Sequence, residues 1–119
     1  MKRGEVWLVQ LDPVKGSEVG KRRPAVVLQN DLANLSSPTV TVLPLTTNAD
    51  RVFPFQVLLA AGEGGLPRPT KVLCEQIRTV SRQRLEKRLG ALSAHRLAEI
   101  RVALDRHLWF EPAYPTAGS

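Results

Sequence analysis

Up to Leu92, the chain alternates between short runs of β-forming residues and polar segments rich in glycine, proline, asparagine and serine. Apolar runs of roughly four to eight residues bounded by such turn formers are typical of β-strands. The pattern predicts strands at residues 5–11, 23–29, 39–45, 55–60, 70–80 and 86–92, with the exit of the fifth strand included in its range. Alternation along that fifth strand would place Val72, Cys74 and Gln76 on one face.

One segment at the C-terminal end has the periodicity of a helix. Leu97, Ile100, Leu104 and Leu108 recur at spacings of three and four residues, which places them in one stripe along a helix. Ser93 precedes this segment and is a favourable N-cap residue. We expect the stripe to pack against the sheet or against a partner.

The order of these elements predicts the fold class. Several short strands followed by one helix favour a β-rich α+β fold, in the form of a small, strongly bent barrel or sandwich with the helix packed on it. A length of 119 residues, 43% of them hydrophobic, suits one domain with one core. We place this domain at residues 1–110 and expect residues 111–119 to form a flexible tail.

Three polar segments separate the predicted strands in informative ways. Residues 12–22 form a long connection for so small a domain, and long loops are often functional. Residues 30–38 are dense in turn formers. Pro44 cannot donate a backbone hydrogen bond, so its strand is expected to reach an edge or a bulge there.

The chain is basic, with 17 Lys and Arg against 11 Asp and Glu, a net charge of +6. This charge is compatible with a polyanionic partner, whereas the small number of aromatic residues argues against a base-stacking sheet. No apolar run approaches the roughly 20 residues of a membrane span. Because Met1-Lys2-Arg3 is followed by Gly4-Glu5 and not by an apolar segment, we expect no secretory signal and a cytoplasmic protein that does not bind membranes.

Several kinds of catalytic site are disfavoured by the residues available. Cys74 is the only cysteine and reads as a small core residue. His95 and His107 both fall on the predicted helix, about 18 Å apart, too far to act on one phosphate. The acidic residues are scattered singly, without the spacing of metal ligands. We therefore expect neither a metal nor another cofactor.

The remaining candidates are a basic cluster and a pair of hydroxyls. Lys21, Arg22 and Arg23 stand where the long loop enters a strand, and Pro24 biases Arg23 to an extended backbone. An arginine fixed there can hold two phosphate oxygens. Thr46 and Thr47 follow the third strand, which would hold a hydroxyl rigidly. The residues alone favour a solvated basic turn over a phosphate site for the arginine cluster. For the two threonines they are equally compatible with hydroxyls that only cap the strand end.

Six short segments, in this order, resemble the MazF/PemK family of toxin endoribonucleases: residues 3–7 (RGEVW), 11–13 (LDP), 16–18 (GSE), 23–31 (RPAVVLQND), 44–47 (PLTT) and 75–80 (EQIRTV). The resemblance implies an SH3-like or CcdB-like β-barrel with a C-terminal α-helix, and a homodimer that binds single-stranded RNA in a groove at its interface. It also implies a MazE-like antitoxin whose C-terminal segment blocks that groove. The implied reaction is a sequence-specific, metal-independent cut by the 2′-hydroxyl, leaving a 2′,3′-cyclic phosphate and a 5′-hydroxyl.

The resemblance also implies roles for individual residues. Arg23 and Thr46 match the catalytic arginine and threonine of the family, and Glu18 matches a glutamate considered as a proton acceptor. Arginine is a reluctant proton donor, so an electrostatic role is expected for Arg23, with Thr46 orienting the phosphate. The further contacts to RNA are expected at Ser17, Lys21, Thr47, Gln76 and Arg78. The loop at residues 51–68 is of a kind that varies in the family, and the RNA sequence that is cut cannot be read from it.

Two other functions fit a fold of this kind. One is a non-catalytic toxin like the CcdB-type gyrase inhibitors, and the other is an RNA-binding module without activity. The arginine–proline and leucine–threonine–threonine positions favour the ribonuclease.

Overall fold

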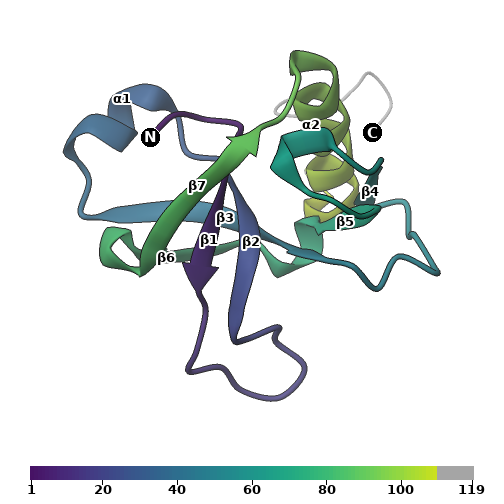
Figure 1. Cartoon of the computed structure of the whole chain (residues 1–119), viewed down its shortest axis with the longest axis horizontal. Coiled ribbons are helices and arrows are strands. Elements are labelled where there is room, and N and C mark those ends of the chain that lie inside the picture. The colour runs from purple at the N-terminus through teal and green to yellow at the C-terminus, as the bar shows by residue number, and fades with distance from the viewer. Residues whose placement is uncertain (110–119) are drawn as a thin grey trace, which may run out of the picture.

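A computed structural model describes residues 1–109 of the chain. Its strands and helices follow one another as shown in Figure 1. The strands are β1 (Glu5–Gln10), β2 (Arg22–Val27), β3 (Thr39–Thr46), β4 (Gln56–Leu59), β5 (Thr70–Leu73), β6 (Arg78–Ser81) and β7 (Leu85–Ala91), and the α-helices are α1 (Asp31–Ser36) and α2 (Ala94–Leu108). Single turns of 3₁₀ helix lie at Glu63–Gly65, Cys74–Gln76 and Arg82–Arg84.

The seven strands form one antiparallel, bent sheet in the order β4-β5-β3-β2-β1-β7, and β6 pairs with β3 off this path. The predicted β-rich α+β fold with a packed C-terminal helix is confirmed. Because β4 and β7 are the two ends of the order, the described strands make an open sheet and not a closed barrel. Among the residues described, no helix is long and apolar enough to cross a membrane. The predicted tail at residues 111–119 lies outside the described residues.

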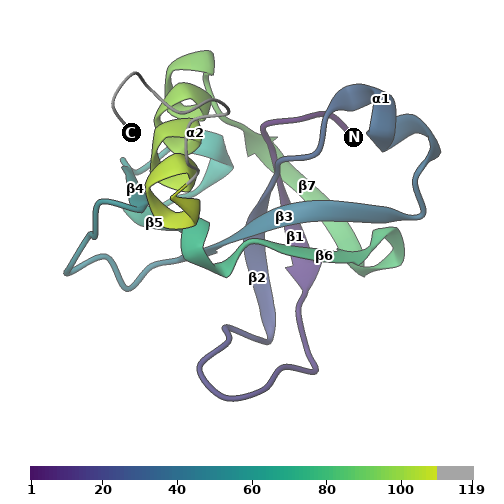
Figure 2. The same ribbon diagram turned by 180° about the vertical axis from the view of Figure 1, so that it is seen from behind.

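Strand β3 is the centre of the sheet and changes partner along its length. On one side it pairs with β2, and on the other it pairs first with β6, over Thr39–Val42, and then with β5 at Leu45 and Thr46. Figure 2 shows β6 and β3 running side by side. Pro44 lies between these two partners. The Thr41 carbonyl accepts a hydrogen bond from the Leu28 N–H, directly after β2, so the backbone groups of Thr41 face β2. Because these groups alternate in direction along a strand, the nitrogen of Pro44, three residues later, faces away from β2. The missing N–H therefore costs no ladder bond, because β3 pairs with neither β6 nor β5 at Pro44. The strand is nevertheless central in the sheet and not at the expected edge or bulge.

Both faces of the central strands are covered, which explains their unbroken apolar runs. Alternate residues of β2 and β3 enter two separate clusters. One cluster lies between the sheet and α2 and includes Val26, Leu43, Leu45 and Ile100. The other lies on the opposite face and is formed by Val9, Leu11, Ala25, Val27, Val40, Val42 and Val80.

Helix α2 begins as the sequence predicts, with the Ser93 hydroxyl accepting a hydrogen bond from the Arg96 N–H at 3.2 Å. Ile100 is fully buried, and Leu97 and Leu104 pack against the same cluster. Leu108 is 43% exposed, so the packed stripe ends one turn earlier than predicted. The helix packs against β4 and against the 3₁₀ turn at Cys74–Gln76 that follows β5.

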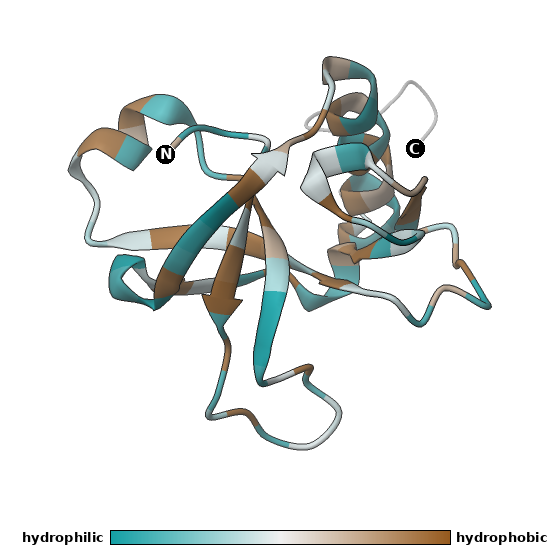
Figure 3. Cartoon of the chain, in the orientation of Figure 1, coloured by the Kyte–Doolittle hydropathy of each residue, from teal (hydrophilic) through white to brown (hydrophobic). Residues whose placement is uncertain are grey.

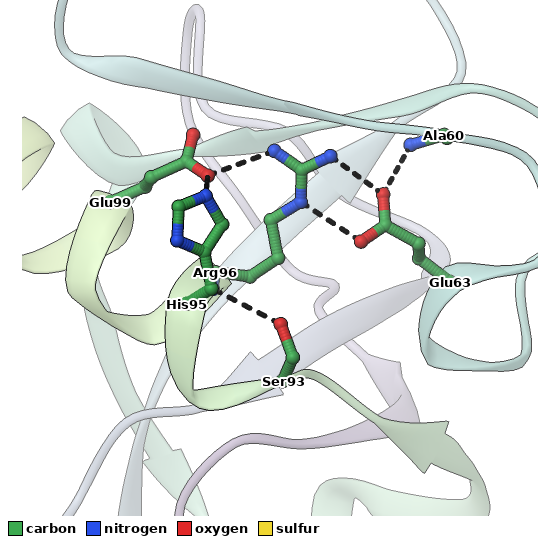
Figure 4. A network of polar contacts seen from close by, with 6 residues as sticks. All are labelled: Ala60, Glu63, Ser93, His95, Arg96 and Glu99. Atoms are coloured by element: carbon green, nitrogen blue, oxygen red, sulfur yellow. Dashed lines mark hydrogen bonds and ion pairs between the residues drawn. The ribbon is translucent and has the colours of Figure 1, made fainter.

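A network of hydrogen bonds and ion pairs connects α2 to the segment after β4 (Figure 4). The Arg96 guanidinium donates to both carboxylate oxygens of Glu63 at 2.9 Å and to Glu99 at 2.9 Å. This bidentate pair lowers the pKa of Glu63, chiefly through the hydrogen bonds from Arg96. Gly65, beside Glu63, has φ of +75°, and a Cβ there would lie 2.0 Å from the Leu89 carbonyl oxygen, so only glycine allows this segment to approach β7.

Two segments differ from the sequence predictions. Residues 30–38 contain α1, which begins where the Asn30 side chain accepts a hydrogen bond from the Ala33 N–H at 2.8 Å; the asparagine and aspartate that suggest a turn also start helices. The fifth strand ends at Leu73, and a 3₁₀ turn then carries the chain from β5 to β6. Because alternation stops at this turn, Cys74 is buried while Gln76 is partly exposed, and the prediction that they share a strand face was wrong.

Candidate anion site at the end of the central strand

The candidate site lies where β2, β3 and β5 run side by side. Ala25 pairs with Pro44 at the end of the β2–β3 ladder, and Arg23 and Thr46 stand two residues beyond that pair on their strands and line the same hollow. On the other side of β3, Thr46 pairs with Lys71 of β5. Directly opposite residues of adjacent antiparallel strands project to the same face of a sheet. One hydroxyl therefore stands between two cationic side chains.

The donors of these side chains are only partly used within the described residues. The Arg23 Nε donates to the Gly20 carbonyl at 2.8 Å, which orients the guanidinium and leaves its two terminal nitrogens for another acceptor. The Lys71 Nζ donates to the Arg51 carbonyl at 2.6 Å, and an ammonium group has three donors. The Thr46 Oγ1 accepts from the Asn48 N–H at 3.2 Å, so its own hydrogen is available to an incoming oxygen.

These side chains line one open hollow of about 440 Å³, which we term the Arg23 hollow. Its lining residues are Val19, Arg23, Thr46, Asn48, Gln56, Lys71, Leu73, Glu75 and Gln76. Three of the residues singled out by sequence, Arg23, Thr46 and Gln76, are thus brought together. The hydropathy colouring shows the hydrophilic start of β2 giving way to its apolar continuation (Figure 3).

The β1–β2 loop carries three further predicted site residues, Ser17, Glu18 and Lys21. The loop extends away from the sheet (Figure 1), and all three side chains are exposed and outside the lining of the Arg23 hollow. The Glu18 carboxylate accepts a hydrogen bond from the Lys15 N–H at 2.9 Å and so caps its own loop. Lys21 has φ of 65°, an uncommon backbone conformation for a residue with a side chain, and its carbonyl closes the loop by accepting from the Leu11 N–H at 2.8 Å.

Both ends of this loop are fixed to other parts of the fold. Arg84, in the 3₁₀ turn before β7, donates to the Gln10 carbonyl at 3.1 Å and also to the Asp12 carbonyl. Arg22 forms a bidentate pair with Glu86 of β7 at 2.8 and 2.6 Å, and its hydrogen bonds lower the pKa of Glu86. The root of the loop, and with it the start of β2, is therefore firmly placed even though the loop itself is exposed.

The two remaining predicted residues lie at the margins of the site. Thr47 lines two smaller hollows next to the Arg23 hollow. Arg78 begins β6, pairs with Val42 and does not line the Arg23 hollow. Its Nη1 atom is buried and has no hydrogen-bond partner among the described residues, so the structure does not place it as a surface contact.

Four polar residues of the hollow were missed by the sequence reading: Lys71, Asn48, Gln56 and Glu75. Lys71 joins the site only through its pairing with Thr46, which no local pattern shows. Gln56 comes from β4 and donates to Glu75 at 2.6 Å. The one available signal was the position of Glu75 directly before Gln76.

Neither the cysteine nor the two histidines line the Arg23 hollow. Cys74 is fully buried, and burial raises the pKa of its thiol to about 12. His95 contacts Glu99 at 3.1 Å, and His107 packs edge-on against Phe55 with ring centroids 5.9 Å apart. Within residues 1–109, no three His, Cys, Asp or Glu side chains gather as metal ligands would. The arrangement is suited to bind an anion between two cations and a hydroxyl.

Both the sequence and the fold of this chain are similar to those of known proteins. The family model described as PemK-like, MazF-like toxin of type II toxin–antitoxin system matches residues 2–108. The endoribonuclease MazF9 of Mycobacterium tuberculosis is 47% identical over 113 residues, which cover 91% of this chain and 96% of that protein. A crystal structure of MazF from Deinococcus radiodurans superposes with a TM-score of 0.80 at 31% identity, covering 92% of this chain and 97% of that one. A MazE–MazF structure from the same organism gives a TM-score of 0.73 at 28% identity, with 93% and 97% covered.

Proposed function

Because the chain belongs to the family of PemK-like, MazF-like toxins of type II toxin–antitoxin systems, we propose that it is an endoribonuclease that cuts single-stranded RNA in the Arg23 hollow. The observation that carries this proposal is the row of Arg23, Thr46 and Lys71 on three adjacent strands. A phosphate of the RNA backbone is the anion that these three side chains would bind. The reaction belongs in the cytoplasm, where the substrate is found.

In the proposed reaction, the 2′-oxygen of one nucleotide attacks the adjacent phosphorus and displaces the 5′-oxygen of the next nucleotide. The products are a 2′,3′-cyclic phosphate and a 5′-hydroxyl, so no water is consumed, and the proton that the 2′-hydroxyl loses is balanced by the one that the departing 5′-oxygen gains. Negative charge develops on the phosphoryl oxygens of the pentacoordinate transition state. The terminal nitrogens of Arg23 and the Lys71 ammonium stabilise that charge, and preorganised donors of this kind are among the largest contributions to catalysis.

Thr46 serves as the orienting group of the site. Its hydroxyl is fixed by the end of β3 and by the bond from the Asn48 N–H, which directs its hydrogen toward the phosphate. Holding the phosphate in this way aligns the 2′-oxygen for in-line attack. Thr46 and Arg23 therefore act on the same phosphoryl group from adjacent strands.

Two carboxylates can accept the 2′-hydroxyl proton. Glu75 lines the hollow, where one of its oxygens accepts from Gln56. Glu18 reaches the hollow only if the β1–β2 loop changes conformation, since it now bonds to Lys15. Comparing Glu18→Gln with Glu75→Gln decides between them, because loss of the proton acceptor lowers the cleavage rate and removes the acidic limb of its pH profile.

The remaining predicted contacts extend the substrate path. Ser17 and Lys21 on the loop, Thr47 beside the site and Gln76 within it are proposed to contact RNA, with Lys21 on a phosphate and Gln76 on a base edge. Arg78 is proposed as a further RNA contact that requires its side chain to move outward. We also propose a homodimer, and an antitoxin partner whose C-terminal segment occupies the RNA path. The MazE–MazF structure of the Deinococcus relative supports the antitoxin partner.

The decisive experiment incubates the purified protein with long single-stranded RNA in the presence of EDTA. Discrete fragments with 2′,3′-cyclic phosphate and 5′-hydroxyl ends are expected. Intact RNA over several sequences, with RNA bound, would identify a silent RNA-binding module. Intact and unbound RNA together with inhibition of DNA gyrase would identify a gyrase-directed toxin instead.

A further inference from the structure

A second, smaller hollow adjoins the Arg23 hollow and shares Thr46 with it. We term it the Pro67 hollow, and its volume is about 110 Å³. It is lined by Pro24, Leu45, Thr46, Thr47, Leu66, Pro67, Arg68 and Thr70. Since Pro24 follows Arg23, the two hollows lie on either side of the β2–β3 pair that holds the phosphate site. The Pro67 hollow therefore borders the phosphate site at Thr46.

The walls of the Pro67 hollow are apolar and held in place. Leu66 is buried, its N–H donates to the Glu63 carbonyl at 3.0 Å, and its carbonyl accepts from the Gly62 N–H at 2.6 Å. Thr70 is buried, and its hydroxyl donates to the Arg68 carbonyl at 2.9 Å. The backbone on both sides of Pro67 is thus fixed, which makes the hollow a preformed feature.

Arg68 supplies the only charged side chain in this lining. No ion pair or side-chain hydrogen bond occupies its guanidinium among the described residues, in contrast to Arg22, Arg88 and Arg96. A guanidinium plane stacks on aromatic rings and on nucleobases. The combination of apolar walls with one free planar cation suits a flat heterocycle better than a phosphate, which would find one donor group and many apolar atoms.

The size of the hollow restricts its occupant further. Sites for drug-sized ligands occupy roughly 300–1,000 Å³, so about 110 Å³ admits a single ring and little else. Sequence-specific recognition of single-stranded RNA splays bases out of their stack and holds them one at a time. A base next to the phosphate held by Thr46 is the ring that the substrate delivers to this position.

We propose that the Pro67 hollow binds one base of the nucleotides flanking the cleaved bond, with Arg68 stacked on that base, and that this contact helps to set the RNA sequence that is cut. The proposal rests on the proposed ribonuclease function and adds to it a determinant of specificity. It assigns to Pro67 and Arg68, at the end of the connection between β4 and β5, a role separate from the phosphate chemistry of Arg23 and Thr46.

The test compares cleavage of a randomised RNA library by the wild-type protein and by Arg68→Ala, Arg68→Lys and Arg51→Ala, with sequencing of the cut ends. Arg51 is the matched control because it is also exposed and cationic, stacks over Phe53 at 4.6 Å and lines neither hollow. Base stacking on a protein side chain contributes roughly tenfold per base. Stacking itself does not distinguish bases, but a hollow that admits a single ring lets a pyrimidine stack on Arg68 and excludes the fused rings of a purine. We therefore expect Arg68→Ala to reduce a pyrimidine preference about tenfold at one position next to the cut, and to leave preferences elsewhere unchanged.

Two further arms separate stacking from charge and locate the base. Arg68→Lys keeps the charge but not the plane, so it should lose the same preference as Arg68→Ala. An abasic nucleotide at the affected position should slow the wild-type protein about tenfold and the Arg68→Ala protein less than twofold. Arg51→Ala should reproduce the wild-type preferences.

The outcomes that overturn the proposal are distinct. An equal loss of cleavage at all sequences would make Arg68 a phosphate contact. Unchanged preferences combined with weaker dimerisation or weaker antitoxin binding would make the hollow a protein-docking surface. If the wild-type protein cuts no RNA, the proposed function fails and this assignment fails with it; if it cuts with preferences that Arg68→Ala leaves intact, only this assignment fails.

Discussion

Replacing Arg23 by alanine separates the catalytic role of this residue from its structural one. The side chain makes one bond within the described fold, from Nε to the Gly20 carbonyl at 2.8 Å. A hydrogen bond of this kind contributes about 1 kcal/mol to stability, against roughly 5–15 kcal/mol for a whole domain. The Arg23→Ala protein should therefore stay folded at 25 °C.

The effect on cleavage should be far larger than the effect on stability. Removal of a single preorganised donor from a developing oxyanion slows reactions by roughly 10²–10³-fold. Arg23 directs two terminal nitrogens and a full charge at the phosphate, so we expect a loss of at least about 10³-fold, or about 4 kcal/mol of transition-state stabilisation. Arg23→Lys should fall between the two proteins, because an ammonium keeps the charge but lacks the planar fork that holds two phosphate oxygens.

Arg22→Ala is the matched control for this experiment. It removes the same charge from the adjacent position, but Arg22 points to Glu86 and not into the hollow. Its cleavage rate should stay within about threefold of the wild-type rate. The assay is single-turnover cleavage, with excess protein, of a short RNA containing one cut site, and urea unfolding of each variant confirms the fold. An Arg23→Ala protein within tenfold of the wild-type rate, or equal losses for Arg22→Ala and Arg23→Ala, would refute the reasoning.

Three further predictions concern the hydroxyl, the charge and the stability of the fold. Thr46→Val should slow single-turnover cleavage about 10²-fold with little change in RNA affinity, and a loss confined to affinity would contradict an orienting role. Binding of RNA to a cleavage-inactive variant should weaken with salt, with a log–log slope near −3 for about four phosphate contacts, whereas a flat response in filter binding would exclude a charged groove. Partial burial acts to raise the pKa of Glu5, but hydrogen bonds from the Lys2 N–H, Arg88 and Trp7 outweigh it and lower the value from 4.5 to about 2. Because this pKa is depressed in the folded protein, the carboxylate stabilises the fold above about pH 4.5 and loses that effect as the pH falls toward 2. The difference in unfolding free energy between wild type and Glu5→Gln in urea titrations should thus be about 2 kcal/mol at pH 7 and close to zero at pH 2; a difference independent of pH would show that the charge of Glu5 is not responsible.

Local features of the chain were predicted well because their causes lie within a few residues of one another. The N-cap at Ser93 and the buried position of Ile100 follow from side-chain type and from the helical repeat. The buried run that begins at Ala25 follows from its lack of polar residues. The break after Leu73 was missed because a 3₁₀ turn and a strand can share the same residue types, and only the need to move from β5 to β6 along β3 selects the turn.

For the site, the sequence by itself determined which residues were candidates, since Arg23 and Thr46 stand in short ordered segments that resemble one family. The tertiary structure alone decided how they meet. Pairing of β2 with β3 brings Arg23 and Thr46 to the same hollow, and register between β3 and β5 adds Lys71, which no sequence pattern had marked. The tertiary structure also shows that the Glu18 carboxylate bonds to the Lys15 N–H of its own loop and does not line the hollow. Strand pairing joins residues far apart along the chain, and its register depends on the packing of the whole sheet, so the chemistry of this site exists only once the sheet has formed.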